Sequence, residues 1–364
     1  MSWEEELISL YDKNSSQAGI ISYKSVKKNG KEEKIPYALL PIFHTTVTAQ
    51  IQVTLGADGE FLGASKVGSE DKMTIIPVTE KSNGGRTSGP APHPFCDELK
   101  YLDGNYEKYL EEKSKDLRKY HLSYMEALEK WHFSSFTHEK VDALWLYLKK
   151  GTLIQDLLQE KILLSNEKGY LADGAKIEGI PQEKAFVRFV VRGKAGIKSG
   201  YTYDECWKDL SLQKCFIQYY RSIEGEKELD YLTGEMQTPS YLHSKKIRNE
   251  SDGAKLISSN DELNFTFRGR FTTKEQAFAI GNETSQKMHN ALKWIIRKQG
   301  RSFDALTIVT WESDMKEMPP WDVDTEMISS VAPSDIASET GEEDFHDLFQ
   351  DDLPEGWKEE QKET

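Results

Sequence analysis

The stretch Thr45-Thr-Val-Thr-Ala-Gln-Ile-Gln-Val-Thr-Leu55 decides the fold class, because apolar and polar residues alternate along it. A period of two places every second side chain on the same face of a strand, so the stretch predicts a strand with one buried face. The residues predicted for that face are Val47, Ala49, Ile51, Val53 and Leu55.

The residues that follow predict further strands. Gly56-Ala-Asp-Gly59 has the composition of a turn, Glu60 to Val67 returns as a second arm, and Met73 to Val78 provides a third strand. Short alternating runs bounded by turn residues indicate an antiparallel meander. Glu80 to Pro94 is too rich in glycine and proline for a helix or a central strand, so we expect an exposed loop there.

Helical periodicity is strongest outside this region. The spacing of the apolar residues predicts a first helix at Trp3 to Tyr11 and a helical stretch from Tyr106 to Trp131. Further helices are predicted at Val141 to Leu148, Leu153 to Ile162 and Thr202 to Ser222, and strands at Ala185 to Val191 and Ala305 to Trp311. A capping box at Thr272 or Thr273 predicts a helix to about Lys298, with Ala277, Gly281, Thr284, Met288, Ala291 and Ile295 on its inner face.

Together these elements predict an α+β protein, and the length of 364 residues suits two or three domains. We expect a β-rich domain at 1–100, a helical region at 101–180, a mixed α/β region at 181–320 and an acidic linker or disordered tail at 321–364. The apolar runs are too short to cross a bilayer and the N-terminus does not look like a signal peptide, so a cytoplasmic location is expected. Cys96, Cys206 and Cys215 lack metal-binding spacing and are expected to be reduced.

The charge is distributed unevenly along the chain. The net charge is −14, but residues 312–364 carry 18 acids and 3 lysines, which leaves 43 acids and 44 bases before them. Because counterion release by clustered Lys and Arg drives nucleic-acid binding, a nearly neutral body can bind DNA locally. The cations cluster in Lys24 to Lys34, Arg188 to Lys198 and Lys245 to Arg270.

One ordered set of short motifs runs along most of the chain. The first part of the set is His243, Ile247-Arg248, Gly253-Ala-Lys-Leu-Ile-Ser-Ser-Asn260 and Gly269-Arg-Phe271. The second part is Arg86-Thr87, Phe95-Cys96-Asp97, Tyr101 with Gly104, Leu232-Thr233-Gly234, Asn290-Ala291-Leu292 and Thr307-Ile-Val-Thr-Trp311. The set resembles a known family of CRISPR proteins, the large subunit of the type I-C Cascade complex. Two features depart from the family: the Cys that usually precedes its Leu-Thr-Gly element is absent, with Asp230 or Tyr231 near that position, and its long C-terminal helical part is missing.

The resemblance implies a subunit of a guide-RNA complex that recognises the protospacer-adjacent motif in double-stranded DNA, helps to separate the strands and recruits a helicase-nuclease. Implied partners are target duplex and displaced single strand, guide RNA, other Cascade subunits, and anti-CRISPR proteins. No enzyme activity, cofactor or metal is expected. The chain lacks a phosphate-loop motif, and the one adjacent His-Asp pair, His346-Asp347, lies in the acidic segment.

The loop between Glu80 and Pro94 is the predicted motif-reading site. Adjacent glycines let a backbone approach a groove where a Cβ would collide, and Asn or Arg side chains can hydrogen-bond to base edges in the minor groove. The predicted motif-reading residues are Asn83, Gly84, Gly85, Arg86 and Thr87, with Lys66 and Lys81 holding nearby phosphates. A flexible connection that touches nothing is the alternative interpretation of this loop.

Cations mixed with glycines, hydroxyls and amides are typical of contacts to the phosphate backbone, which carry no sequence information. The residues predicted for this role are Arg188, Arg192, Lys194, Lys245, Lys246, Arg248, Lys255, Ser258, Ser259, Asn260, Arg268 and Arg270. His243 is either a phosphate contact or a structural histidine, and Ala185 to Val191 is alternatively a strand with one solvated face.

Two other classes of function stay open: a metal-dependent nuclease or other nucleic-acid enzyme, and a scaffold whose basic regions face guide RNA or neighbouring subunits. The acidic segment is either a linker to the missing helical part or a DNA mimic that lowers non-specific binding.

Overall fold

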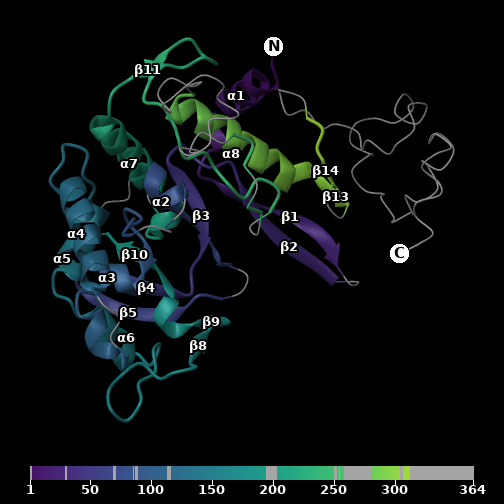
Figure 1. Cartoon of the computed structure of the whole chain (residues 1–364). Coiled ribbons are helices and arrows are strands. Elements are labelled where there is room, and N and C mark those ends of the chain that lie inside the picture. Colours follow the sequence, from purple (N-terminus) through teal and green to yellow (C-terminus); the bar gives the residue numbers. More distant parts are fainter. Residues whose placement is uncertain are drawn as a thin grey trace. The chain divides into compact units, whose positions relative to one another are not determined.

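The computed structural model describes residues 2–28, 31–68, 71–84, 86, 89–112, 116–193, 203–249, 252–253, 255–257, 280–303 and 306–311 (Figure 1). Contacts along the chain divide it into Met1–Val309 and Thr310–Thr364, and every helix and strand given below belongs to the first unit. These elements confirm the α+β class. The predicted acidic tail lies outside the described residues.

A four-stranded sheet has the order β5 (Phe61–Lys66), β4 (Ile51–Gly56), β10 (Phe186–Arg192) and β7 (Asp97–Glu98). β4 pairs with β5 in an antiparallel hairpin and with β10 in parallel, so that Ile51 lies opposite Val187. Parallel neighbours need a crossover connection, and the helices between β7 and β10 provide it. In β4, the alternation predicted from the sequence is confirmed, because Ile51, Val53 and Leu55 are fully buried.

The stretch that predicted one long strand forms two. β3 (His44–Thr48) pairs with β6 (Met73–Pro77), and the chain changes sheet at Ala49 and Gln50 before β4 begins. The buried Gln50 side chain holds this break: its amide donates to the Thr48 carbonyl at 2.8 Å and its oxygen accepts from Phe186 N at 2.8 Å. The third predicted strand therefore pairs with β3 and not with the returning arm β5.

Helices cover both ends of this strand system. α1 (Trp3–Lys13) begins with a capping box between Ser2 and Glu5 and packs against α8 (Asn282–Gln299). α3 (Leu99–Leu102), α4 (Arg118–His132), α5 (Glu139–Leu148) and α6 (Leu153–Gln159) lie beside β4, β5 and β10 in Figure 1. α7 (Leu210–Ile223) is a further helix of 14 residues. Trp131 of α4 is fully buried, with its ring 6.1 Å from Phe95 and 5.0 Å from Phe216.

The other elements are short or peripheral. β1 (Ile21–Lys28) and β2 (Lys31–Ala38) form a long hairpin, and three further two-stranded pairs are β8 (Lys176–Ile177) with β9 (Ile180–Pro181), β11 (Glu228–Leu229) with β12 (Met236–Gln237), and β13 (Arg301–Phe303) with β14 (Leu306–Ile308). α2 (Glu80–Gly84) is a single short helix.

Several predicted boundaries need correction. The Tyr106–Trp131 stretch is a 3-10 turn at Tyr106–Tyr109 followed by α4, and a 3-10 turn at Cys206–Lys208 precedes α7. Asp209 ends that second turn because its carboxylate accepts from Ser211 N at 2.9 Å and caps α7. α8 begins at Asn282, since Gly281 forms a bridge with Pro239. Thr284, Met288, Ala291 and Ile295 are buried as predicted, whereas the capping box and Ala277 lie outside the described residues.

Candidate nucleic-acid interface

The segment 80–94 is not the exposed loop that its composition predicts. It begins with α2, and Ala91 and His93 are buried. Glu80 anchors the helix to residues 240–242. Its carboxylate oxygen Oε1 accepts hydrogen bonds from Ser240 Oγ at 3.1 Å, Tyr241 N at 2.6 Å and Leu242 N at 2.8 Å. Hydrogen bonds to a charged acceptor are among the stronger ones in proteins. The predicted motif-reading segment therefore lies directly beside residues 240–242. These residues lead into the cation cluster Lys245 to Arg270, which we call the basic segment.

Gly84 marks the closest approach between these two parts of the chain. A Cβ on Gly84 would lie 2.7 Å from Leu242 Cβ, a distance that side chains do not tolerate. Gly84 was predicted to let DNA approach the backbone, but the close approach that requires a glycine here is that of Leu242.

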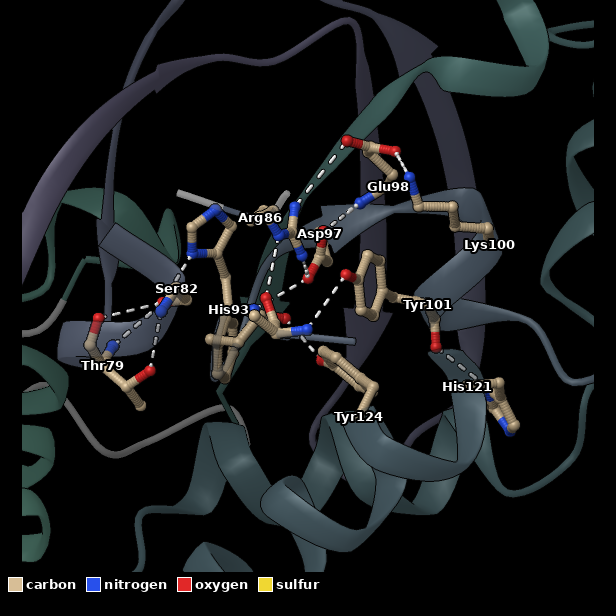
Figure 2. A network of polar contacts seen from close by, with 12 residues as sticks. Thr79, Ser82, Arg86, His93, Asp97, Glu98, Lys100, Tyr101, His121 and Tyr124 are labelled. Atoms are coloured by element: carbon tan, nitrogen blue, oxygen red, sulfur yellow. Dashed lines mark hydrogen bonds and ion pairs between the residues drawn. The ribbon is translucent and has the colours of Figure 1, made fainter. Parts of the chain in front are cut away.

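Arg86 is held inside the protein (Figure 2). Its Nε donates to the Ala91 carbonyl at 2.8 Å, its Nη2 donates to Asp97 Oδ2 at 2.5 Å, and its guanidinium lies 4.2 Å from the centre of the Tyr101 ring. Nη1 lies 3.7 Å from Glu98 Oε1. Because all of its nitrogens face protein groups, Arg86 anchors the loop. It is therefore no longer proposed as a motif-reading residue.

Asp97 is the centre of this anchor. It is fully buried and also accepts from His93 N at 2.8 Å and from Glu98 N at 2.7 Å. Burial raises the pKa of Asp97 to about 6, and the charge of Arg86 and the hydrogen bonds act in the opposite direction. Burial also lowers the pKa of His93 well below its usual range, as do the charges of Arg86 and Lys246.

His93 links the anchor to α2. Its Nδ1 lies 3.1 Å from Ser82 Oγ, and Ser82 in turn exchanges hydrogen bonds with Thr79 at 3.0 and 3.1 Å (Figure 2). α2 is thus fixed at its first residue, Glu80, and at its middle residue, Ser82, which contacts His93. Its Lys81 stays exposed and its Asn83 is half-buried.

The basic segment presents its cations from a tight turn. Lys245, Lys246 and Arg248 are exposed, and Lys255 is half-buried. Lys246 has a φ of 61°, in the left-handed region, and its N–H donates to the Asp252 carbonyl at 2.9 Å. Arg248 donates to the Asp252 carboxylate with Nε at 3.0 Å and Nη2 at 3.1 Å. Asp252 therefore shapes the turn and partly neutralises Arg248.

His243 is a structural residue and not a surface phosphate contact. It is 1% exposed, and its Nδ1 lies 2.8 Å from Ser285 Oγ on α8. Its ring lies 6.0 Å from that of His289, at an interplanar angle of 22°. These contacts fasten the basic segment to α8.

The burial of Arg188 contradicts the prediction that it contacts the DNA backbone. It is 2% exposed, and its guanidinium donates to Gln52 Oε1, to the Asp71 carbonyl at 2.7 Å and to Asp71 Oδ2 at 2.7 Å. It also stacks 3.7 Å from the centre of the Trp207 ring. β10 is buried on both faces, so the alternative of one solvated face is wrong as well.

The remaining predicted residues fall into two groups. Lys66 and Arg192 are exposed on the four-stranded sheet, at the end of β5 and of β10 respectively. The others lie outside the described residues: Gly85, Thr87, Lys194, Ser258, Ser259, Asn260, Arg268 and Arg270.

The sequence analysis missed two cations on α8. Arg297 Nη2 donates to the Lys246 carbonyl at 3.4 Å, and Arg297 Nη1 donates to the Lys293 carbonyl at 3.3 Å. Their four-residue spacing on a predicted helix places Lys293 and Arg297 on one face, which is the signal that could have found them.

Three general findings bear on the class of protein. No group of three or more His, Cys, Asp or Glu side chains suited to a metal ion occurs within the described residues. None of the described helices is both long and apolar enough to span a membrane. All three cysteines are free, as predicted, with Cys96 and Cys206 buried.

Comparison with known proteins gives one family. A model of the CRISPR-associated protein family Cas_Csd1 matches residues 21–362, which includes every described part of the interface and most of the acidic segment. No curated protein matches the chain. Since the match covers most of the sequence, it confirms the resemblance to the type I-C Cascade large subunit, and the chain belongs to the Csd1 family of CRISPR-associated proteins.

Proposed function

We propose that this protein is a non-catalytic DNA-recognition subunit of a guide-RNA Cascade complex. It recognises the protospacer-adjacent motif in duplex DNA, assists strand separation and offers a surface to the recruited helicase-nuclease. Guide pairing supplies most of the sequence information in such complexes, so the protein needs a short readout and backbone contacts. The family membership supports the complex, and one observation supports the DNA role: Glu80 of α2 binds the backbone of Tyr241 and Leu242, which lead into the cations of 245–248.

In this proposal, the roles differ between the two sides of the interface. Asn83 reads base edges from α2, and Lys81 holds a phosphate next to it. Lys245, Lys246, Arg248 and Lys255 hold the duplex without reading sequence. Lys66 and Arg192 stay proposed phosphate contacts on the sheet. Among the residues outside the described ranges, Gly85 and Thr87 stay proposed motif-reading residues, and the proposed backbone contacts are Lys194, Ser258, Ser259, Asn260, Arg268 and Arg270.

The division between reading and holding can be tested with the assembled complex. Asn83→Ala is expected to weaken binding to a motif-bearing duplex by about 1–3 kcal/mol and to leave binding to other duplexes unchanged. Lys245→Gln with Lys246→Gln is expected to weaken binding to all duplexes and to reduce the salt slope by about one for each phosphate lost. Filter binding across a salt series measures both effects.

Lys214→Gln with Lys227→Gln is the matched control, because both lysines are exposed and lie outside the proposed interface. The proposal is overturned if the Asn83 variant weakens every duplex equally, or if the control pair reduces the slope as much as Lys245 and Lys246 do.

The absence of catalysis is tested separately. We expect no cleavage when the purified protein is incubated with Mg²⁺ or Mn²⁺ and labelled DNA. Cleavage that disappears when one carboxylate is changed would establish a nuclease instead.

A further inference from the structure

A small hollow lies where the basic segment, α8 and β3 meet. Its lining includes Lys246, Lys293 and Arg297, together with the hydroxyl-bearing Thr45 and Thr46 of β3. Lys293 is buried, with 8% of its surface exposed, while the two threonines are half-buried. Cations and hydroxyls are the groups that bind phosphate oxygens.

Arg297 and Lys246 are held by hydrogen bonds to backbone carbonyls. Arg297 donates to the carbonyls of Lys293 and Lys246, which joins the last turns of α8 to the basic segment. The left-handed backbone of Lys246 is held by its hydrogen bond to the Asp252 carbonyl. The cations therefore converge because two segments far apart in the sequence, α8 and the basic segment, are tied together, and not because they are neighbours along the chain.

The rest of the lining is apolar, and the volume of the hollow is small. Ala38, Leu40 and Met73 line it, and the first two belong to a buried hydrophobic cluster. A cation next to apolar groups attracts an anion more strongly than one surrounded by water. The volume is about 20 Å³, which admits one or two water-sized groups. Phosphate oxygens can enter, whereas a base or a sugar cannot.

The positive charges of this region act on two buried histidines, His289 and His93. Burial lowers the pKa of His289 to about 3, and the charges of Lys293 and His243 add to that effect against a hydrogen bond to the Ser285 carbonyl. Lys246 acts in the same way on His93, as described above.

We propose that this hollow binds one phosphate group of the target duplex and so sets the position of α2 along the DNA. This inference rests on the proposed function, because it takes the bound polymer to be duplex DNA. It assigns to Lys293, Arg297, Thr45 and Thr46 a role that the sequence did not indicate.

The test uses the assembled complex and a duplex without the motif. Lys246→Gln and Arg297→Gln are each expected to reduce the slope of log K against log salt by about 0.9, the value for one phosphate contact. The double variant is expected to lose clearly less affinity than the product of the two single losses, since both side chains hold the same phosphate. Lys287→Gln is the matched control, because Lys287 lies on α8 and pairs with Asp12 at 2.8 Å.

A second arm identifies the ligand. Neutral methylphosphonate linkages are placed one at a time along the duplex, and at one position the affinity loss caused by Lys246→Gln should vanish. Lys246 is exposed, so this variant is expected to keep the melting temperature of the wild type even if Arg297→Gln does not.

The inference is overturned by unchanged slopes in both single variants, by losses that multiply fully in the double variant, or by an equal effect of Lys287→Gln. It is also overturned if no methylphosphonate position removes the effect, as expected for guide RNA or a protein partner. These outcomes are separable from the proposed function: a wild-type complex that does not discriminate motif-bearing duplexes refutes motif recognition, whatever the slopes show.

Discussion

At the scale of single residues, Arg86 and Asp97 show how a site can depend on a group that does not contact the ligand. Asp97 is fully buried, and Arg86 has only 20% of its side chain exposed. Removing one member of a buried ion pair leaves an uncompensated charge and typically costs about 3–5 kcal/mol. Because Asp97 also holds the N–H groups of His93 and Glu98, the loss extends along the segment that carries α2.

The pH dependence of this pair follows from the raised pKa of Asp97. A carboxyl group at about 6 in the folded protein and 3.8 in the unfolded chain contributes stability below pH 3.8 that is lost as the pH rises through about 6. Arg86→Gln removes the compensating cation and raises this pKa further. The variant is therefore expected to lose more free energy of unfolding at pH 8, about 3 kcal/mol, than at pH 5, where the lone carboxyl is protonated.

Urea unfolding of the wild type and of Arg86→Gln at the two pH values measures the effect. Adding Asp97→Asn to Arg86→Gln should abolish the pH-dependent part, because no ionisable group then stays at that position. An equal loss at pH 5 and pH 8 for the single variant would show that packing, and not charge, dominates the contribution of Arg86.

At the scale of elements, the interface depends on the contact between α2 and residues 240–242. Gly84→Ala places a Cβ against Leu242, and overpacking of this kind costs about 1–3 kcal/mol. We expect a lower melting temperature and faster hydrogen exchange at Tyr241 and Leu242, whose N–H groups Glu80 holds.

Leu242→Ala added to Gly84→Ala should not recover the contact, because the Cβ of residue 242 is itself the nearest atom, whereas Leu242→Gly should recover much of it. Gly68→Ala is the matched control, since no heavy atom lies within 4 Å of its added Cβ. A loss in the control equal to that in Gly84→Ala would show that the contact with Leu242 is not the cause.

The same scale shows what the sequence can and cannot predict. Alternation located β4 and helical spacing located α1, α5 and the inner face of α8, because both signals are local. The break between β3 and β4 was missed because it depends on Gln50 meeting Phe186, a partner far away in sequence. α2 was missed because a five-residue helix is held by Glu80 and Ser82 contacts that no local pattern shows.

The candidate site follows the same rule. The sequence predicted Lys81, Asn83 and Lys245 to Arg248 by composition, and the structure joins α2 to residues 240–242 through the Glu80 carboxylate. It could not separate Arg188 and Arg86 from exposed cations, since only tertiary structure reveals that Trp207 and Tyr101 cover them.

At the scale of the whole molecule, charge is divided between a nearly neutral body and the segment 312–364, which carries 18 acids and 3 lysines. Net negative charge repels DNA over about a Debye length, close to 10 Å at 0.1 M salt. A chain that ends at Trp311 is therefore expected to bind non-specific duplex more tightly than the full chain at 50 mM salt, and the difference should shrink at 300 mM. Fluorescence anisotropy at the two salt concentrations measures this.

A variant that keeps the segment but changes eight of its acids to amides is the control for length. It should behave like the shortened chain if charge is the cause, and like the full chain if the segment acts by its bulk.

The parallel pairing of β4 with β10 has a consequence for biosynthesis. Ile51 must wait for Val187 before the sheet can close, and Leu40 and Pro41 must wait still longer for Asn290. Pairings over such separations form slowly, and a chain leaving the ribosome exposes the unpaired edge of β4 in the meantime. The sheet therefore cannot close until β10 has been synthesised, and the yield of this protein in a cell should depend on chaperones that shield the early strands.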